Sequence, residues 1–268
     1  MPAVTMTMPI LPELPSAAAA GVGLVLGAIA GSFLSTLVVR WPAGRAMSGR
    51  SACDGCGRPL GALALVPLVS FLAQRGRCRA CGARIDPRHF LIEVGAAAIG
   101  ATSLGLAPDM AGLAGALFGW LLLTLGVLDL QHFWVPDRLT GTLALIGLGA
   151  GAAGLPPTLA DRVAGGATGF AALALIGWSY RRLRGRVGLG QGDPKLLGAV
   201  GLWLGWAALP FVLLGASLFG LAVVAVGRAA GRPFAGSDRL PLGTLMAAAA
   251  WPLWCIAQAL PGFLPFAR

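Results

Sequence analysis

Long stretches without charged residues dominate the chain, and short polar segments separate them. A helix that crosses a bilayer needs about 20 apolar residues, and most of these stretches approach or exceed that length. The run 196–227 contains Pro210 and is long enough for two helices, whereas 91–108, which includes Glu93, is a weaker candidate. The pattern predicts an all-α polytopic membrane protein with about eight transmembrane helices. The uncharged stretches are 16–39, 110–128, 139–160, 163–179, 196–227 and 240–267.

Composition and charge agree with a membrane protein and orient it. The chain is 57% hydrophobic and only 11% charged, whereas soluble domains are about a quarter charged. No basic residue precedes Arg40, so we expect no signal peptide and an N-terminus outside the cytoplasm. With eight alternating spans, all lysines and arginines except Arg162 and Arg268 fall on one side, which the positive-inside rule makes cytoplasmic. This describes a multi-pass membrane protein whose basic loops lie in the cytoplasm.

The net charge of +10 has two interpretations. Basic proteins often bind nucleic acid, but a one-sided distribution is also what membrane topology alone produces. We therefore expect membrane lipid as a partner and no nucleic acid. The basic residues cluster in 40–88, at Arg138, in 181–186, at Lys195 and in 228–239.

One polar insert, between the first and second predicted helices, contains four of the five cysteines. They form two CxxC pairs separated by 21 residues, a spacing typical of a structural zinc knuckle with four thiolate ligands. Two disulfides are the alternative, but a cytoplasmic location argues against them. We predict three regions: 1–41, an N-terminus and first helix; 42–90, a zinc-binding cytoplasmic insert; and 91–268, a membrane core. The predicted ligands are Cys53, Cys56, Cys78 and Cys81.

Three carboxylates fall in or next to apolar segments, where a charge is costly and therefore indicates function. Glu93 lies near a helix start, where the helix dipole alone favours it. Asp129 ends an uncharged helix, and Asp137, which follows Pro136, is well placed as the N-cap of the next helix. Asp193 begins another helix, also at the cytoplasmic boundary. We expect Asp129 and Asp193 to be buried together.

Two adjacent carboxyl groups share a proton, which is the arrangement of aspartyl proteases. Gly190 and Gly192 leave room for another backbone beside Asp193. Lys195 lies two residues further on, and either anchors the helix at the lipid headgroups or pairs with the dyad. A proton-coupled transporter that uses the same carboxylates, and a non-catalytic assembly factor that binds a partner through its basic insert, are the alternatives from other classes.

These residues resemble a known family. The motif Gly190-Gln191-Gly192-Asp193, extended by Lys195, is similar to the GxGD motif of intramembrane aspartyl proteases of the bacterial prepilin peptidase type. Presenilin-like proteases share GxGD but have Pro-Ala-Leu in a late span, where this chain has Leu240-Pro241-Leu242-Gly243. Further motifs follow in the same order: 31–34 with Arg40, the two CxxC pairs, Asp129 with Pro136-Asp137, and Pro241 with Gly243.

The resemblance implies that Asp129 and Asp193 are the catalytic pair, with Gly190, Gly192 and Lys195 in supporting positions. It implies prepilin and pseudopilin substrates of type IV pili and type II secretion, cleaved where a short basic leader meets a hydrophobic helix. Family members with the four-cysteine insert also methylate the new N-terminal amine with S-adenosylmethionine. No strand, glycine-rich turn and helix unit of the Rossmann type is present in the sequence, so the cofactor's site is not assigned.

Overall fold

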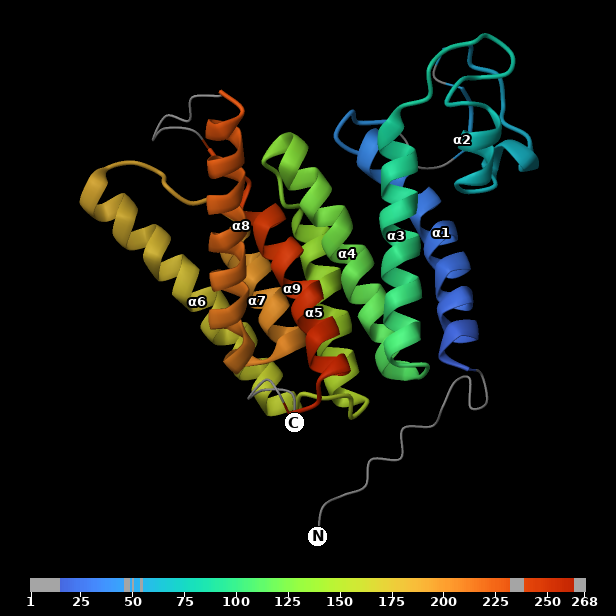
Figure 1. Cartoon of the computed structure of the whole chain (residues 1–268). Coiled ribbons are helices and arrows are strands. Elements are labelled where there is room, and N and C mark those ends of the chain that lie inside the picture. Colours follow the sequence, from blue (N-terminus) through green and yellow to red (C-terminus); the bar gives the residue numbers. More distant parts are fainter. Residues whose placement is uncertain (1–14, 46–48, 50, 54, 232–238, 263–268) are drawn as a thin grey trace. The chain divides into compact units, whose positions relative to one another are not determined.

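A computed structural model describes residues 15–45, 49, 51–53, 55–231 and 239–262 (Figure 1). Regular structure in these residues is helical, apart from two isolated β-bridges in the insert. They form two compact units, one within 8–124 and one in 125–268. The all-α prediction is confirmed, whereas the predicted non-cytoplasmic N-terminal residues 1–14 lie outside the described part of the chain. The bridges join Ala52 to Pro59 and Arg77 to Arg84.

The first unit is built on two long helices, α1 (Ser16–Arg40) and α3 (Pro87–Leu106). A Cβ atom on Gly23 would lie 2.1 Å from the carbonyl oxygen of Gly100, and one on Gly27 would lie 2.2 Å from that of Ala96. Backbones can approach this closely only where side chains are absent, as in small-residue helix pairs of membranes. The short elements η1 (Ala62–Leu65) and α2 (Val69–Ala73) lie in the insert that α1 and α3 flank.

The start of α3 is fixed by local chemistry. Asp86 occupies the N-cap and accepts a hydrogen bond of 2.9 Å from the backbone N–H of Arg88. Its carboxylate also forms an ion pair with the Arg88 guanidinium. Proline at the next position, Pro87, is favoured in a first helical turn because its missing N–H would have no partner there. The insert therefore ends, and the helix begins, at a defined residue.

The second unit contains the end of α4 (Met110–His132), then α5 (Asp137–Ala152), α6 (Leu159–Arg184), α7 (Gly192–Leu204), η2 (Trp206–Ala208), α8 (Leu209–Ala229) and α9 (Leu242–Ala259). Helix α7 is its centre, in contact with α5, α6, α8 and α9, and ten of its thirteen residues are buried. Trp203 donates an indole hydrogen bond of 2.7 Å to the carbonyl of Leu143 on α5. On the α6 side, Gly165 and Gly201 face one another, and a Cβ on Gly201 would lie 2.2 Å from the Gly165 carbonyl oxygen.

A buried arginine connects several backbone segments near the C-terminal end of α7. Arg162, on α6, is 2% exposed and lies between α5, α7 and the loop 155–157. Its guanidinium donates five hydrogen bonds, and all five acceptors are backbone carbonyl groups. The acceptors are those of Gly147 (2.9 Å), Leu155 (3.3 Å), Pro156 (2.8 Å), Pro157 (3.0 Å) and Leu202 (3.0 Å).

The helix count agrees with the sequence pattern. Within the described residues, six helical segments are long and apolar enough to cross a membrane: α1, α3, α4, α6, η2 with α8, and α9. Helices α5 and α7 are shorter, with 16 and 13 residues, and bring the set to the expected eight. The long run 196–227 is divided at Gly205, whose φ of +78° ends α7, and Pro210 lies in the first turn of α8.

Candidate active site and metal centre

Asp129 lies near the end of α4, and its side chain is held by α9. The residue is 5% exposed. Its Oδ2 atom accepts a hydrogen bond of 2.8 Å from the backbone N–H of Thr244. The Thr244 hydroxyl lies 3.3 Å from the same oxygen and 2.8 Å from the carbonyl oxygen of Gly126, one turn earlier on α4. Thr244 thus joins the two helices at the carboxyl group and fixes its orientation.

Asp193 lies in the first turn of α7, where the preceding loop binds it. The residue is 7% exposed, and its Oδ2 atom accepts a hydrogen bond of 3.0 Å from the backbone N–H of Gly190. A Cβ atom on Gly190 would lie 2.8 Å from that oxygen. A side chain at this position would therefore displace the carboxylate, which explains the first glycine of the motif.

Val135 connects the surroundings of the two aspartates. A Cβ atom on Gly192, next to Asp193, would lie 2.7 Å from the Val135 Cβ atom. On the other side, a Cβ on Gly243 would lie 3.1 Å from Val135 Cγ2 and 2.9 Å from Asp129 Oδ2. The side chain of Val135 therefore fills the space that these two glycines leave. The two buried carboxyl groups therefore lie on either side of the Val135 side chain.

Lys195 has a different partner from either predicted one. Its Nζ atom donates to both carboxylate oxygens of Asp137, at 2.7 and 2.8 Å. Both side chains are substantially exposed, so this ion pair contributes little to stability by itself. The predicted N-cap role of Asp137 is wrong: α5 begins at Asp137, Pro136 occupies the cap, and the carboxylate is used by Lys195 instead. The pair ties the first turn of α7 to the first turn of α5.

Glu93 belongs to the other compact unit and lies deeper in its helix than the sequence indicated. It is the seventh residue of α3 and is 8% exposed. Its Oε2 atom accepts a hydrogen bond of 2.7 Å from the backbone N–H of Leu68, in the insert. Leu68 has a φ of +62°, which is unusual for a residue with a side chain. Contact with the insert, rather than a helix start, explains the position of this carboxylate.

The four cysteines of the insert converge in space. Their sulfur atoms all lie within 4.8 Å of one another, and those of Cys53 and Cys81 are 3.8 Å apart. None of these thiols forms a disulfide in the described structure. Four sulfurs at about 2.3 Å from a tetrahedral zinc ion lie about 3.8 Å apart, so the cluster fits a structural zinc ion. The predicted disulfide alternative does not describe this arrangement.

Two equivalent turns supply the thiols. The N–H groups of Gly57 and Gly82 donate to the carbonyls of Cys53 and Cys78, and both glycines have positive φ, +69° and +72°. Backbone N–H groups of Cys81 and Ala80 lower the pKa of Cys78 to about 6. Although the backbone of Ala83 opposes it, crowding by the Cys56 thiol and its neighbours raises the pKa of Cys81 to about 11. Such a crowded set of thiols favours a cation among them.

Comparison with known proteins identifies the family. The model of the bacterial peptidase A24 N-terminal domain matches residues 25–105, and that of the type IV leader peptidase family matches 116–225. A prepilin leader peptidase/N-methyltransferase of Aeromonas hydrophila is 41% identical over 75% of this chain and 70% of its own length. The chain belongs to the type IV leader peptidase family.

Other relatives of the same name span still more of the chain. The one from Burkholderia pseudomallei (strain K96243) is 37% identical over 88% of this chain and 84% of its own length. The one from Stutzerimonas stutzeri is 32% identical over 91% and 93%, respectively. No solved structure matches the chain.

The two matched family regions correspond to recognisable parts of the structure. The N-terminal region covers most of α1, the insert with its four cysteines, and α3. The leader peptidase region covers most of α4 and continues to α8, and it contains both aspartates. Helix α9, which provides Thr244 and Gly243, follows the matched region.

Sequence reasoning found the aspartates, the glycines and the cysteines, but it missed two residues that contact the candidate site. Val135 precedes Pro136, and a residue before proline favours an extended backbone. This sequence feature does not predict that the Val135 side chain lies between two glycines. Thr244 is 115 residues from Asp129. Only the packing of α9 against α4 brings them together.

Proposed function

We propose that this chain cleaves the leader peptides of prepilins and pseudopilins with Asp129 and Asp193 as its catalytic pair. One observation supports the assignment: two buried carboxyl groups, on helices far apart in sequence, lie on either side of Val135. Family membership and relatives named prepilin leader peptidases supply the substrate class. A transporter does not account for these relatives.

The proposed reaction uses the pair as acid and base. One carboxylate takes a proton from a water molecule, whose oxygen attacks the scissile peptide carbonyl. The protonated partner donates a proton to the oxyanion, and the tetrahedral intermediate then collapses as the leaving amine accepts a proton. The C–N bond breaks, which gives a leader with a new carboxyl terminus and a mature protein with a new amine. Since the protons belong to the coupled pair, either residue can serve as the base.

Backbone donors prepare the pair for this reaction. The N–H groups of Thr244 and Gly190 each bind one oxygen of Asp129 and Asp193, respectively. Fixed donors of this kind orient a carboxylate without reorganisation during catalysis. The glycines around the pair leave space for the extended backbone of a substrate. Gly190, Gly192 and the Lys195–Asp137 ion pair are assigned to positioning.

We also propose the membrane orientation. Asp129 is near the end of α4 and Asp193 is at the start of α7, so both belong to the ends where short basic segments occur. Positive-inside placement makes these ends and the cysteine insert cytoplasmic in a bacterial inner membrane. The basic residues then face lipid headgroups, and no nucleic acid is involved. A basic leader is cut where it leaves the bilayer.

The second activity follows from the names of the relatives, which are also N-methyltransferases. We propose that the new N-terminal amine is methylated and that S-adenosylmethionine, when bound, supplies an electrophilic methyl group on sulfur. A structural zinc ion would be held by Cys53, Cys56, Cys78 and Cys81, whose sulfur geometry fits it. Four thiolates leave no open coordination position, so its role is to fold the insert.

The test is leader cleavage by aspartate variants. Purified protein with zinc is incubated with a prepilin in detergent micelles, and the product is analysed by mass spectrometry. Asp129→Asn and Asp193→Asn are expected to lower cleavage by at least 1000-fold while circular dichroism and zinc content are unchanged. Asp161→Asn, a conservative change of an aspartate in the first turn of α6, is the control and retains cleavage. Normal processing by both active-site variants would refute the dyad.

A further inference from the structure

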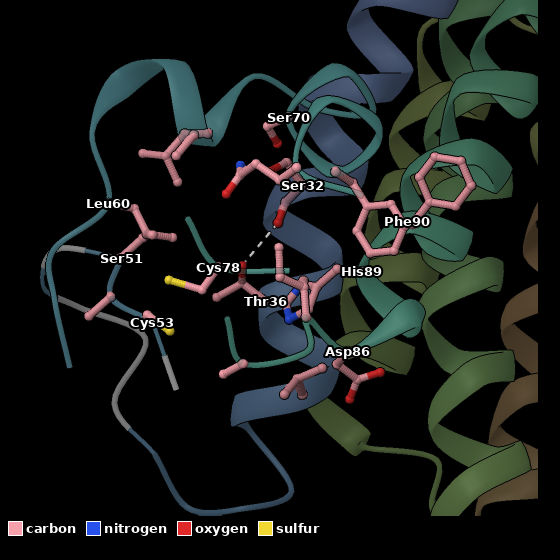
Figure 2. A pocket seen from close by; sticks show the side chains of 18 of the residues that line it. Ser32, Thr36, Ser51, Cys53, Leu60, Ser70, Cys78, Asp86, His89 and Phe90 are labelled. Atoms are coloured by element: carbon pink, nitrogen blue, oxygen red, sulfur yellow. Dashed lines mark hydrogen bonds between the residues drawn. The ribbon is translucent and has the colours of Figure 1, made fainter. Parts of the chain in front are cut away.

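A cavity lies in the first unit, bounded by α1, α3 and the cysteine insert (Figure 2). Its empty space is about 1050 Å3, including its open mouth. Small-molecule sites usually combine apolar walls with a few placed polar groups, and the lining of this cavity has both. The peptidase reaction proposed above does not use it, since both aspartates belong to the other unit.

The cavity has a buried acid in its wall. Glu93 is 8% exposed, and the backbone N–H of Leu68 binds one of its oxygens. Hydroxyl groups of Ser32 and Thr36 on α1 and of Ser70 in the insert line the same space. A buried carboxylate among hydroxyl groups is suited to a cationic ligand or to the hydroxyl groups of a sugar.

Basic and aromatic groups line other parts of the wall. Arg40, Arg45 and Arg84 contribute to the lining, and guanidinium groups bind carboxylates in a bidentate manner. The rings of Phe71 and Phe90 also line it, stacked with centroids 4.8 Å apart and planes 19° apart. Aromatic walls of this kind accept flat heterocycles.

The cavity is also coupled to the metal centre. Cys53 and Cys78 are among its lining residues, and both are labelled in Figure 2. The backbone on the insert side is therefore shaped by the zinc turns, while the α3 side is connected to the insert through the hydrogen bond from Leu68 to Glu93. Loss of the ion would disorganise one wall of the cavity.

We propose that this cavity binds the sulfonium methyl donor, with Glu93 as the group that faces its positive charge or its ribose hydroxyls. The proposal rests on the methyltransferase activity proposed above. A donor of the S-adenosylmethionine class carries a heterocycle, a sugar diol, a sulfonium, an ammonium and a carboxylate. The wall offers an aromatic pair, hydroxyl groups, a buried acid and arginines, so each part has a complementary group.

The transfer is balanced as follows. The neutral amine of the cleaved pilin, after loss of a proton to water, directs its lone pair at the donor's methyl carbon. The N–C bond forms as the S–C bond breaks, and the electron pair of that bond remains on sulfur as a neutral thioether. The nitrogen carries the positive charge and can lose a further proton to solvent. The chain's contribution is to bind and orient, and no oxidant or reductant is required.

Binding can be measured apart from turnover. Equilibrium dialysis of the zinc-loaded full chain in detergent against radiolabelled S-adenosylmethionine gives a Kd. Glu93→Gln keeps the size of the side chain and an acceptor for the Leu68 N–H but removes the charge, and it is expected to weaken binding at least tenfold. Ala64→Trp fills the cavity without removing a polar group and is expected to abolish binding. Ala62→Trp, on the same short helix η1 but exposed and outside the cavity, is the matched control with unchanged Kd.

The outcomes separate this proposal from the activity on which it rests. Weaker binding and methylation in both cavity variants, with leader cleavage and zinc content retained, supports it. If both cavity variants methylate at the wild-type rate and bind the donor with an unchanged Kd, the cavity assignment is overturned, but the methyltransferase activity is not. Cleavage without added methyl mass and without donor binding in the wild type overturns both. If Glu93→Gln does not fold, the comparison of the Kd of Ala64→Trp with that of Ala62→Trp tests the cavity assignment.

Discussion

Replacement of Arg162 by methionine tests how the second unit is held together. Methionine keeps an unbranched side chain of similar length but has no donor for the carbonyl groups of Gly147 and Leu202 or of the loop 155–157. We expect the change to destabilise the fold without touching the catalytic pair. The reason is that Arg162 contacts the end of α7, about 13 Å along the helix from Asp193 by the rise per residue.

The expected size follows from the contacts. A hydrogen bond from a charged donor contributes about 1.5–3 kcal/mol, so five at the lower value amount to about 7.5 kcal/mol. Burial of the guanidinium costs several kcal/mol, which the methionine variant avoids. In the methionine variant, water at the membrane boundary can hydrogen-bond to some of the carbonyl groups of the loop 155–157 that lose the guanidinium. The net loss in the free energy of unfolding is therefore about 3 kcal/mol for Arg162→Met, and about 2 kcal/mol for Arg162→Lys, which keeps the charge but not the planar fork.

The assay is equilibrium unfolding in mixed micelles with increasing dodecyl sulfate, followed by tryptophan fluorescence. Arg182→Met, at the opposite and exposed end of α6, is the control and should change the free energy by less than about 0.5 kcal/mol. Leader cleavage per folded molecule should stay within about twofold of the wild type, since the pair is remote. A loss below about 0.5 kcal/mol in Arg162→Met would show that the carbonyl cluster does not stabilise the unit.

Three further predictions concern the metal, the catalytic pair and a helix cap. Cys78→Ser should reduce bound zinc to less than a tenth of an equivalent by atomic absorption and make the insert sensitive to protease; full metal content would exclude the knuckle. Gly192→Ala places a Cβ 2.7 Å from Val135 and should lower kcat for leader cleavage at least tenfold, whereas Gly141→Ala, with nothing within 4 Å, should not; equal rates would contradict the packing. Asp86→Ala should cost about 1 kcal/mol at pH 7. The Arg88 side chain lowers the pKa of Asp86, so this contribution is complete above the unfolded value of about 4 and decreases as the pH falls through the lower folded value; a cost that is the same at pH 7 and pH 3 would refute it.

The sequence predicted the features that depend on composition along the chain. Seven apolar runs, one of them long enough for two helices, became eight helices, because apolar segments of this length require burial or lipid. Asp129 and Asp193 could be selected because a carboxylate in such a run is costly. The cysteine spacing was sufficient to predict convergence, because two CxxC turns already point their thiols in one direction.

The features that the sequence did not reveal depend on tertiary packing. Asp137 has the sequence context of an N-cap, yet its carboxylate binds Lys195, because α5 and α7 lie side by side. Glu93 was assigned to a helix start, but it accepts a hydrogen bond from Leu68 of the insert, 25 residues earlier in the chain. The hydrophobic pattern of the sequence does not predict such contacts. Each partner fits its own local sequence pattern equally well whether or not the contact forms.

The close pairing of α1 and α3 has a consequence for how the protein acquires its metal. The glycine contacts hold the two helices together, and these helices carry the two ends of the insert. A chain segment whose ends are already close loses less entropy when an ion gathers its four thiols. Membrane insertion of the helix pair thus raises the zinc affinity of the insert. By linkage, zinc in turn stabilises the pairing of α3, one of the least hydrophobic of the candidate spans, with α1. Starvation for zinc should therefore appear first as a defect in membrane assembly rather than as a loss of chemistry.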